Sequence, residues 1–317
     1  MSALNDTALS YAVFLLSRIP GQEDVYLWIA ILFCFIYVIS IVGNSVILFI
    51  IKTDPSLHEP MYIFLSMLAF TDVGFLITTM PTILGVYLFN SREIGLDACF
   101  AQLSFIAALQ CTESAVLLLM AIDRFIAICN PLRYASILTL PRISKMGLVS
   151  VLKSVVLVFP FPFLLKPYRY CRANVLSHSF CLNMEVMKMA CSDITVNNIY
   201  GLFIRISTMG LDLLLIFFSY VMILKTVLSI ASRVECLRAL STCVSHLCAV
   251  LLFYTPEFSL SLIHRLAKDT SPLLRILLSY VSLLVPPLLN PIVYSVKSTR
   301  LRARIIKVFL GGRGTQG

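Results

Sequence analysis

The chain has 317 residues, of which 59% are hydrophobic and 13% charged, and its formal net charge is +9. Soluble domains carry about a quarter charged residues, so one water-soluble core does not account for a mean hydropathy of +0.92. A lipid bilayer is the natural solvent for such a chain. The basic residues stand between apolar runs rather than along one face, and we therefore expect no nucleic-acid partner.

Apolar stretches long enough to cross a bilayer recur along the chain. A spanning helix needs about 20 residues, and seven stretches satisfy this, at residues 25–51, 60–88, 98–129, 143–165, 197–230, 236–263 and 272–296. The sequence therefore predicts an all-α membrane protein, a seven-transmembrane helix bundle. We divide it into an N-terminal segment (1–24), a membrane domain (25–297) and a C-terminal tail (298–317).

The basic residues orient this bundle. With the N-terminus outside, fourteen of the 25 Lys and Arg residues fall on the cytosolic side, as the positive-inside rule requires. The sequon at Asn5 then lies outside, where it is a candidate glycosylation site. No cleaved signal peptide is indicated in the first residues, so the first membrane helix is expected to direct insertion.

The tail after the seventh span has the pattern of a short amphipathic helix over residues 298–310. Its apolar side chains are expected to face lipid and its basic ones to meet anionic headgroups. The apolar set is Leu301, Ile305, Val308 and Phe309, and the basic set is Arg300, Arg302, Arg304 and Lys307. A solvated basic tail is the alternative.

Several short motifs stand at the ends and middles of these spans. They are MAIDRFIAIC at 120–129, NPLRY at 130–134, GN at 43–44, PMYIFLSMLAFTD at 60–72, SY at 219–220 and PPLLNPIVY at 286–294. Together they closely resemble the rhodopsin-like G-protein-coupled receptors. LSTCVSHLCAV at 240–250 and the cysteines of the long second outer loop are similar to olfactory receptors. The loop run at 177–194 and IHR at 263–265 resemble their fish-like class I branch.

The resemblance implies a conformational switch on the cytosolic side. Asp123 and Arg124 end the third span, and Arg124 is expected to leave a local partner and meet the G protein on activation. The residue after them is Phe125 rather than the commoner Tyr. Tyr220 and Tyr294 are expected to swing toward the core. Asn290 and Pro291 form the NPxxY pattern with Tyr294, and proline removes a backbone hydrogen bond so that the helix bends.

Polar residues also fall in the middle of the spans. Asn44, Asp72, Glu113 and Asn290 lie on helices that converge in this family. An ionised acid within the membrane costs about 3 kcal/mol or more. Two expectations remain open here: a sodium ion or ordered water bridges Asp72 and Glu113, or one of the two carboxyls stays protonated. Beyond that sodium ion no cofactor is expected.

Four cysteines lie on the predicted outer side, where disulfides form, and four cysteines allow three pairings. The resemblance selects Cys99 with Cys181, and Cys171 with Cys191. These bonds would hold the long loop over a pocket.

Two absences narrow the ligand of such a pocket. The outer part of the third span, residues 102–111, has no acid to anchor an amine, and the apolar part of the seventh span has no lysine for a retinal Schiff base. By resemblance Arg265 recognises a carboxylate, which its planar guanidinium pairs with through two hydrogen bonds. Ser261, one turn below, adds a hydrogen bond. A solvated arginine at a helix end is the alternative for Arg265.

Arg205 is unusual because it stands inside a span. The hypothesis is an interhelical ion pair with Glu257 that lines the pocket, and its rival makes Arg205 the ligand anchor. Ala107 and Met184 replace polar residues of relatives and make the pocket more apolar or larger. Lys153 has no assigned partner, and an interhelical or snorkelling role is favoured. The expected wall residues, which helix packing explains equally well, are Phe105, Ala108, Leu109, Thr112, Leu202, Ile206, Phe253 and Tyr254.

Other protein classes fit the sequence less well. A transporter would show internal repeats or paired broken helices, and an enzyme would need a nucleophile–base or metal constellation, which the four scattered histidines do not provide. The resemblance implies a multi-pass plasma-membrane odorant receptor, not an enzyme. It would bind a small volatile or carboxylic-acid-like ligand and activate a stimulatory heterotrimeric G protein, raising cAMP.

Overall fold

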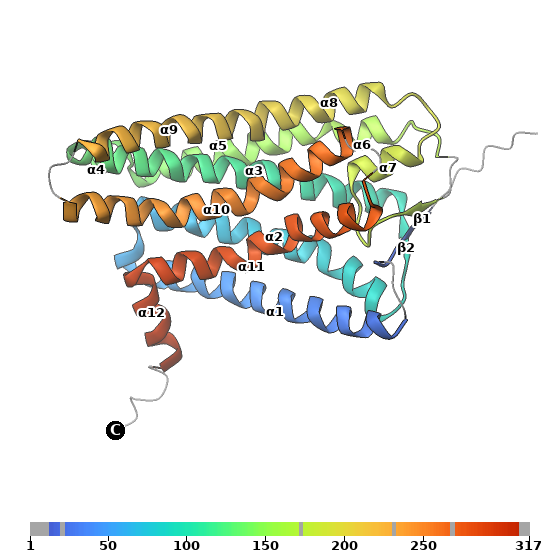
Figure 1. The fold of residues 1–317 in the computed structure, drawn as a ribbon, viewed down its shortest axis with the longest axis horizontal. Helices are drawn as coiled ribbons and strands as arrows, with labels where there is room; N and C mark the ends of the chain where they lie inside the picture. The colour runs from blue at the N-terminus through green and yellow to red at the C-terminus, as the bar shows by residue number, and fades with distance from the viewer. Residues whose placement is uncertain (1–12, 20–22, 171–173, 230–232, 267–269, 311–317) are drawn as a thin grey trace, which may run out of the picture.

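The computed structural model describes residues 13–19, 23–170, 174–229, 233–266 and 270–310. Long helices run side by side along the bundle (Figure 1). They are α1 (Glu23–Thr53), α2 (Pro60–Leu88), α3 (Leu96–Cys129), α5 (Leu140–Val158) with α6 (Pro160–Leu165), α8 (Thr195–Arg205) with α9 (Leu211–Leu228), α10 (Arg233–Leu266) and α11 (Pro272–Lys297). A π-helical turn, Ile206–Gly210, joins α8 to α9.

These helices form seven crossings that are long and apolar enough to span a membrane within the described residues. Each agrees with a predicted span to within a few residues, apart from the sixth, whose qualifying stretch begins at Cys243. Large apolar side chains on the outside of the bundle, such as Trp28 and Phe70, are 71% and 70% exposed. That exposure is costly in water and favourable in hydrocarbon, so the prediction of a seven-helix membrane bundle is confirmed.

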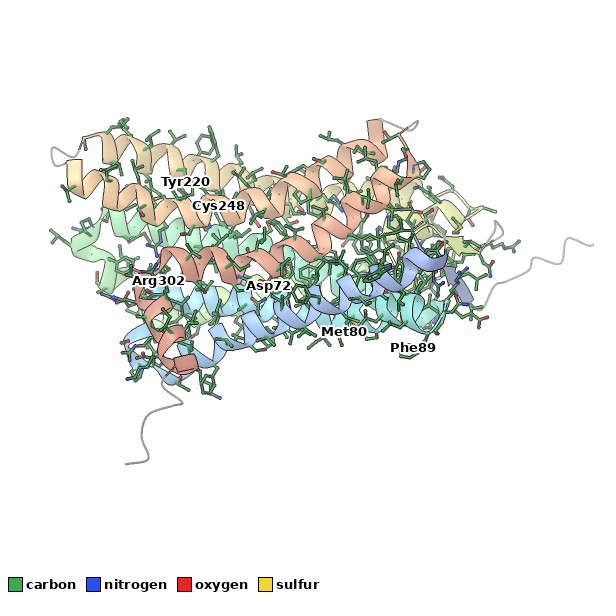
Figure 2. The ribbon with its side chains drawn as sticks, turned by 60° about the horizontal axis from the view of Figure 1, so that its bottom comes forward. Asp72, Met80, Phe89, Tyr220, Cys248 and Arg302 are labelled. Atoms are coloured by element: carbon green, nitrogen blue, oxygen red, sulfur yellow. A yellow bond between two sulfur atoms is a disulfide. The ribbon has the colours of Figure 1, made fainter. Side chains whose placement is uncertain are left out.

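Two hydrophobic clusters follow one another along the inside of the bundle. The outer hydrophobic cluster contains Phe33, Phe100 and Tyr280 and reaches the end where the chain begins. The inner hydrophobic cluster contains Phe64, Leu117 and Tyr294 and reaches the opposite end. Asp72 lies between the two ends, with Phe89 toward the first and Arg302 toward the second (Figure 2).

A small sheet at the predicted extracellular end departs from the all-α expectation. Strand β1 (Val13–Leu16) pairs antiparallel with β2 (Glu93–Gly95) and parallel with β3 (Val175–Leu176). Phe14 on β1 is fully buried and meets the Tyr170 ring edge-on, with the ring centroids 5.3 Å apart. Strands this short carry no periodic signal, and their partners are remote in sequence. The N-terminal segment is thus partly built into the fold, although Asn5 lies outside the described residues.

Among the described residues, the short α-helices α4 (Tyr134–Ile137) and α7 (Asn183–Met189) lie in connections, and α12 (Thr299–Leu310) is the last element of the chain. Helix α12 follows the seventh crossing and turns away from the bundle axis (Figure 1). It is the predicted tail helix, but its partners differ from those expected. Leu301 is fully buried in the inner hydrophobic cluster instead of facing lipid, because the turn at Ser298 directs the first residues of α12 back against the bundle.

Two of its arginines also meet protein acids rather than headgroups. Arg300 Nη1 lies 2.5 Å from Glu59 Oε1, and Arg304 Nε lies 2.5 Å from Asp54 Oδ2. Hydrogen bonds from Ser56, helped by the charge of Arg304, hold the pKa of the Asp54 carboxyl below its usual range. Acidic side chains of the α1–α2 connection therefore bind basic side chains of α12. Arg302, Lys307 and Val308 remain exposed.

A matched pair of truncations tests this docking. Leu301→Ala removes a fully buried side chain and should destabilise the protein by about 2 kcal/mol or more, whereas Val308→Ala, on the same helix but 47% exposed, should change little. Thermal unfolding of the two purified variants in detergent micelles measures the difference. Equal midpoints for both variants would contradict the buried position of Leu301.

Candidate functional site

A cavity of about 100 Å³ opens in the outer half of the bundle, between α3, α8, α10 and the loop helix α7. Its walls are mostly apolar, with a few polar groups. They include Leu103, Ile106, Ala107, Gln110, Phe161, Leu182, Asn183, Met184, Asn198, Ile204, Arg205, Thr208, Leu260 and Ser261. A small concave site with few convergent polar groups is typical of a small-molecule pocket.

Four of the predicted ligand contacts line this cavity: Ala107, Met184, Arg205 and Ser261. Others lie elsewhere. Ala108 is only half-buried and packs against the outer hydrophobic cluster, because adjacent helical residues point about 100° apart. Tyr254 and Glu257 are buried behind the cavity wall. Arg265 is in the last turns of α10, and its side chain lies outside the described part of the structure.

The remaining wall predictions are wrong as well. Phe105, Leu202 and Ile206 are 63%, 37% and 60% exposed on the outer surface of the bundle. Leu109, Thr112 and Phe253 are also not among the residues that line the cavity. Sequence reasoning also missed Gln110, Asn183, Asn198 and Thr208, which supply most of the polar lining. A polar residue on a spanning helix was a usable signal for Gln110 and Thr208. Asn183 had no such signal, because its position depends on how the loop folds over the bundle.

The lid over the cavity is the second outer loop, fastened to α3. Cys99 and Cys181 form a disulfide, as predicted, with their Cα atoms 5.5 Å apart. The Cys181 backbone N–H also donates to Gln102 Oε1 at 2.8 Å. Cys191 is disulfide-bonded as well, and its predicted partner, Cys171, lies outside the described residues. The loop is therefore fixed close to residues 182–184, which touch the cavity.

The predicted partnership of Arg205 and Glu257 is present. Arg205 Nη1 lies 3.1 Å from Glu257 Oε2, joining the fifth and sixth crossings. The other oxygen, Oε1, accepts hydrogen bonds from Gln110 Nε2 at 2.7 Å and from the Ser282 hydroxyl. Glu257 thus bonds to side chains of three other crossings, which satisfies a carboxylate that would otherwise be costly in the membrane.

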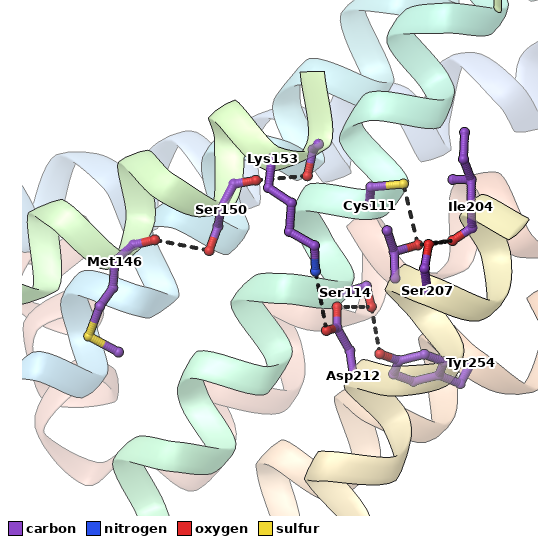
Figure 3. Close-up of polar contacts among 11 residues, drawn as sticks. Cys111, Ser114, Met146, Ser150, Lys153, Ile204, Ser207, Asp212 and Tyr254 are labelled. Carbon is purple, nitrogen blue, oxygen red and sulfur yellow. Dashed lines mark hydrogen bonds and ion pairs between the residues drawn. The ribbon is translucent and has the colours of Figure 1, made fainter. Parts of the chain in front are cut away.

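A second polar chain crosses the bundle deeper in the membrane (Figure 3). Lys153 Nζ lies 3.8 Å from Asp212 Oδ1, and Asp212 Oδ2 accepts a hydrogen bond from Ser114 Oγ at 2.9 Å. Ser114 and the Tyr254 hydroxyl are 2.7 Å apart. Lys153 therefore has an interhelical partner that the sequence did not identify. The chain ties α5, α9, α3 and α10 together and carries Tyr254, which lies one turn from Glu257.

The GN and NP motifs meet at the contact between α1 and α11. Pro291 has no N–H to donate to the carbonyl of Pro287, four residues earlier. Asn44 Nδ2 donates to that carbonyl at 2.9 Å and so satisfies it. A Cβ on Gly43 would lie 3.3 Å from Pro291 Cβ, so a glycine there permits the close approach. The two motifs act as one contact that stabilises a bent seventh crossing.

The other polar midsection residues gather beside this contact. Asn290 Nδ2 donates to Asp72 Oδ2 at 3.1 Å, and Asp72 and Glu113 are close enough to influence each other electrostatically. Glu113 Oε1 and Asn290 Oδ1 are buried without a hydrogen-bond partner among the described residues. Among all the residues that the structure describes, no group of three or more His, Cys, Asp or Glu residues is arranged to hold a metal ion.

At the cytosolic end the predicted switch residues are held in local contacts. Arg124 Nη2 lies 3.0 Å from Asp123 Oδ2, and the Tyr134 hydroxyl donates to Asp123 Oδ1 at 2.7 Å. The Tyr294 hydroxyl points to Met120 Sδ, 3.8 Å away. Arg124 thus pairs with its neighbour, the local partner that the resemblance implied.

Tyr220 has a partner that the sequence did not suggest. Its hydroxyl lies 2.7 Å from His246 Nδ1, and His246 Nε2 lies 2.9 Å from the carbonyl of Leu117. The two rings stack, with centroids 5.7 Å apart. His246 therefore connects α9, α10 and α3. In the sequence, His246 was distinguished by its position in the LSTCVSHLCAV motif, to which no role had been assigned.

A cavity of about 390 Å³ opens at this end. Its lining includes Arg124, Tyr134, His246, Tyr294 and Arg300. The bundle thus has an apolar outer pocket, buried polar contacts in its middle and a larger hollow at the opposite end.

Comparison with known proteins decides the family. The profile described as "Olfactory receptor" matches residues 33–311. Human Olfactory receptor 51G2 is 57% identical over 96% of this chain and 97% of its own length, and human Olfactory receptor 51G1 is 55% identical over 98% and 96%. Human Olfactory receptor 51E1 is 48% identical over 96% and 95%.

The chain belongs to the olfactory receptor family. It is accordingly a multi-pass plasma-membrane receptor, not an enzyme, whose partners are odorant molecules and G proteins. In this receptor the outer cavity and the cytosolic hollow lie toward opposite ends of the bundle, and the buried polar contacts lie between them.

Reversing the Arg205–Glu257 pair tests its role in this olfactory receptor. Arg205→Glu and Glu257→Arg should each abolish the odorant response, since each leaves a buried like-charge pair, and breaking a buried pair costs about 3–5 kcal/mol. The double variant should recover much of the response, measured as dose–response curves normalised to surface expression. A double variant no better than the single variants would contradict the pairing.

Proposed function

We propose that this olfactory receptor binds a small volatile or carboxylic-acid-like odorant in the outer cavity and activates a stimulatory heterotrimeric G protein, which raises cAMP. The observation that carries the proposal is the cavity itself, with its apolar walls and few polar groups under a disulfide-fastened loop. The cavity contacts α3, α8 and α10, so a bound molecule acts directly on crossings that meet again at the cytosolic end.

Coupling would run through the contacts that tie these helices together. An odorant that favours a different packing of α10 against α3 biases the Tyr254–Ser114–Asp212 chain and the His246–Tyr220 contact. Release of Arg124 from Asp123 would then expose its guanidinium in the cytosolic hollow. Ligand and G protein bias the same two-state element, so each strengthens the binding of the other.

The carboxylate anchor in this proposal is Arg265, with Ser261 beside it. Ser261 lines the cavity, and Arg265 follows it by about one turn of the same helix. Arg205 already pairs with Glu257, so the proposal assigns the acid group of the ligand to Arg265. The apolar lining from Ala107 and Met184 favours the alkyl part of the ligand.

Arg265→Ala should lower the potency of aliphatic carboxylic acids at least tenfold, because a charge-assisted contact of about 1.5–3 kcal/mol is lost. The measurement is cAMP accumulation in cells given straight-chain acids of graded length and neutral alcohols of equal length. Leu262→Ala, on the same helix and 55% exposed to lipid, is the matched control. An unchanged acid response at normal surface expression would remove Arg265 as the anchor.

We further propose that a sodium ion occupies the polar midsection near Asp72 and Glu113 in the inactive receptor. The buried, unpartnered oxygens of Glu113 and Asn290 support a cation there, since such oxygens are costly unless satisfied. A bound ion would supply positive charge between two carboxylates. The alternative, in which one carboxyl is protonated, satisfies the same charge balance without an ion.

Replacing sodium chloride with N-methylglucamine chloride in receptor-containing membranes should raise agonist-independent nucleotide exchange on an added stimulatory G protein, because the inactive state loses its ion. Asp72→Asn should make the exchange rate insensitive to this replacement. Phe70→Leu, on the same helix with a lipid-facing side chain, should retain sensitivity. A wild-type rate that does not depend on sodium favours the protonated carboxyl.

A further inference from the structure

The Arg205–Glu257 pair is more than a structural clamp, because one member reaches the odorant cavity. Arg205 and Gln110 both line it, whereas Glu257 lies behind them. The arginine is about one-third exposed and the glutamate nearly fully buried, with side-chain exposures of 32% and 3%. A ligand in the cavity therefore meets the guanidinium and not the carboxylate.

The pair as a whole is electrically neutral, and its negative member is well satisfied. Glu257 accepts hydrogen bonds from Arg205, Gln110 and Ser282. These three donors satisfy both oxygens of the buried carboxylate. Its charge offsets that of Arg205, so a ligand approaching this wall meets donors without a net positive field.

The Arg205 guanidinium has further N–H donors besides the one that binds Glu257. It carries five N–H groups, and among the described residues its protein acceptor is Glu257, reached through Nη1. The remaining N–H groups can donate to an acceptor in the cavity. Gln110 uses its Nε2 for Glu257, so this part of the wall is rich in donors already oriented by the carboxylate.

Neutral and anionic ligand groups would bind with different affinities beside Arg205 and Glu257. A carbonyl oxygen gains hydrogen bonds from an ionised donor, which are stronger than those between two neutral groups. A carboxylate gains them too, but it brings a second negative charge close to Glu257 in a medium of low dielectric, where repulsion is strong. The wall therefore discriminates between two oxygen-bearing groups of similar size.

We propose that Arg205, held by Glu257, is a specificity-determining contact that donates hydrogen bonds to the neutral oxygen of a ketone, ester or lactone and disfavours a carboxylate. This rests on the proposed function of the cavity as the odorant site. Ser261, near the proposed acid anchor, and Arg205 both line the cavity, so a preferred ligand carries a carboxylate at one end and a neutral carbonyl at the other. Oxo acids are that class.

Three acids of one chain length test the proposal: valeric acid, levulinic acid and glutaric acid, with their longer homologues in parallel. Besides its carboxylate, valeric acid carries no further oxygen group. Levulinic acid carries a keto group, and glutaric acid carries a second carboxylate. In the wild-type receptor the oxo acid should be at least tenfold more potent than the plain acid, and the diacid weaker than either. Methyl propyl ketone serves as the neutral ligand without an acid group.

Two variants separate the charge from the hydrogen bonds. Glu257→Gln leaves the Arg205 cation without its counter-ion and should reverse the preference, so that glutaric acid becomes more potent than levulinic acid. Arg205→Met combined with Glu257→Gln keeps the wall neutral and removes the guanidinium donors. It should abolish the oxo-acid advantage, so that levulinic and valeric acids become about equally potent. Ile206→Met, the lipid-facing neighbour, is the matched control, and all variants are compared at equal surface expression.

The readout is cAMP together with dissociation sensors for each G-protein class, which keeps the two proposals apart. Activation seen by a sensor without a cAMP rise contradicts stimulatory coupling and still ranks the ligands. A ketone response without any acid response removes the Arg265 anchor and supports the Arg205 contact, provided the double variant loses it. Equal potency of oxo acid and diacid in the wild type, an oxo-acid advantage that survives in the double variant, or no response to any ligand would overturn the proposal.

Discussion

Polar groups in the hydrocarbon core have no water to bond with, and the internal arrangement of this receptor follows from that constraint. Its embedded acids Glu257, Asp212 and Asp72 each accept bonds from a different crossing. The hydrogen-bonded side chains around Glu257, Asp212 and Asp72 therefore form three networks, which lie between the outer cavity and the cytosolic hollow. Because every network joins helices, a shift of one helix breaks bonds that must be remade elsewhere.

That arrangement makes the bundle suited to two states rather than to gradual deformation. In the outer part, Glu257 connects the cavity wall to α11 through Ser282. In the middle, Asn44 occupies the carbonyl that Pro291 leaves free. At the cytosolic end, Arg124 rests on Asp123, and Tyr220 on His246.

The cavity shows how little of a ligand site is visible in a motif. Arg205 was noticeable as a charge within a span, and its partner could be inferred because Glu257 was the nearest acid of matching depth. Gln110 and Ser282, which complete the arrangement, looked like ordinary polar residues. Phe105 and Ile206 resembled wall residues but face lipid, because hydropathy does not distinguish a pocket-facing side from a lipid-facing side when both are apolar.

The sequence by itself determined the crossings, their orientation and the family, since each depends on the length and hydropathy of local stretches or on contiguous motifs such as those around Arg124 and Asn290. Tertiary structure alone decided the β1–β2–β3 sheet, the docking of Leu301 and Arg304 against the bundle, and the partners of Lys153 and His246. Those features join residues far apart in the chain, and the rotation of each helix about its axis, which no local pattern records, selects which polar groups meet.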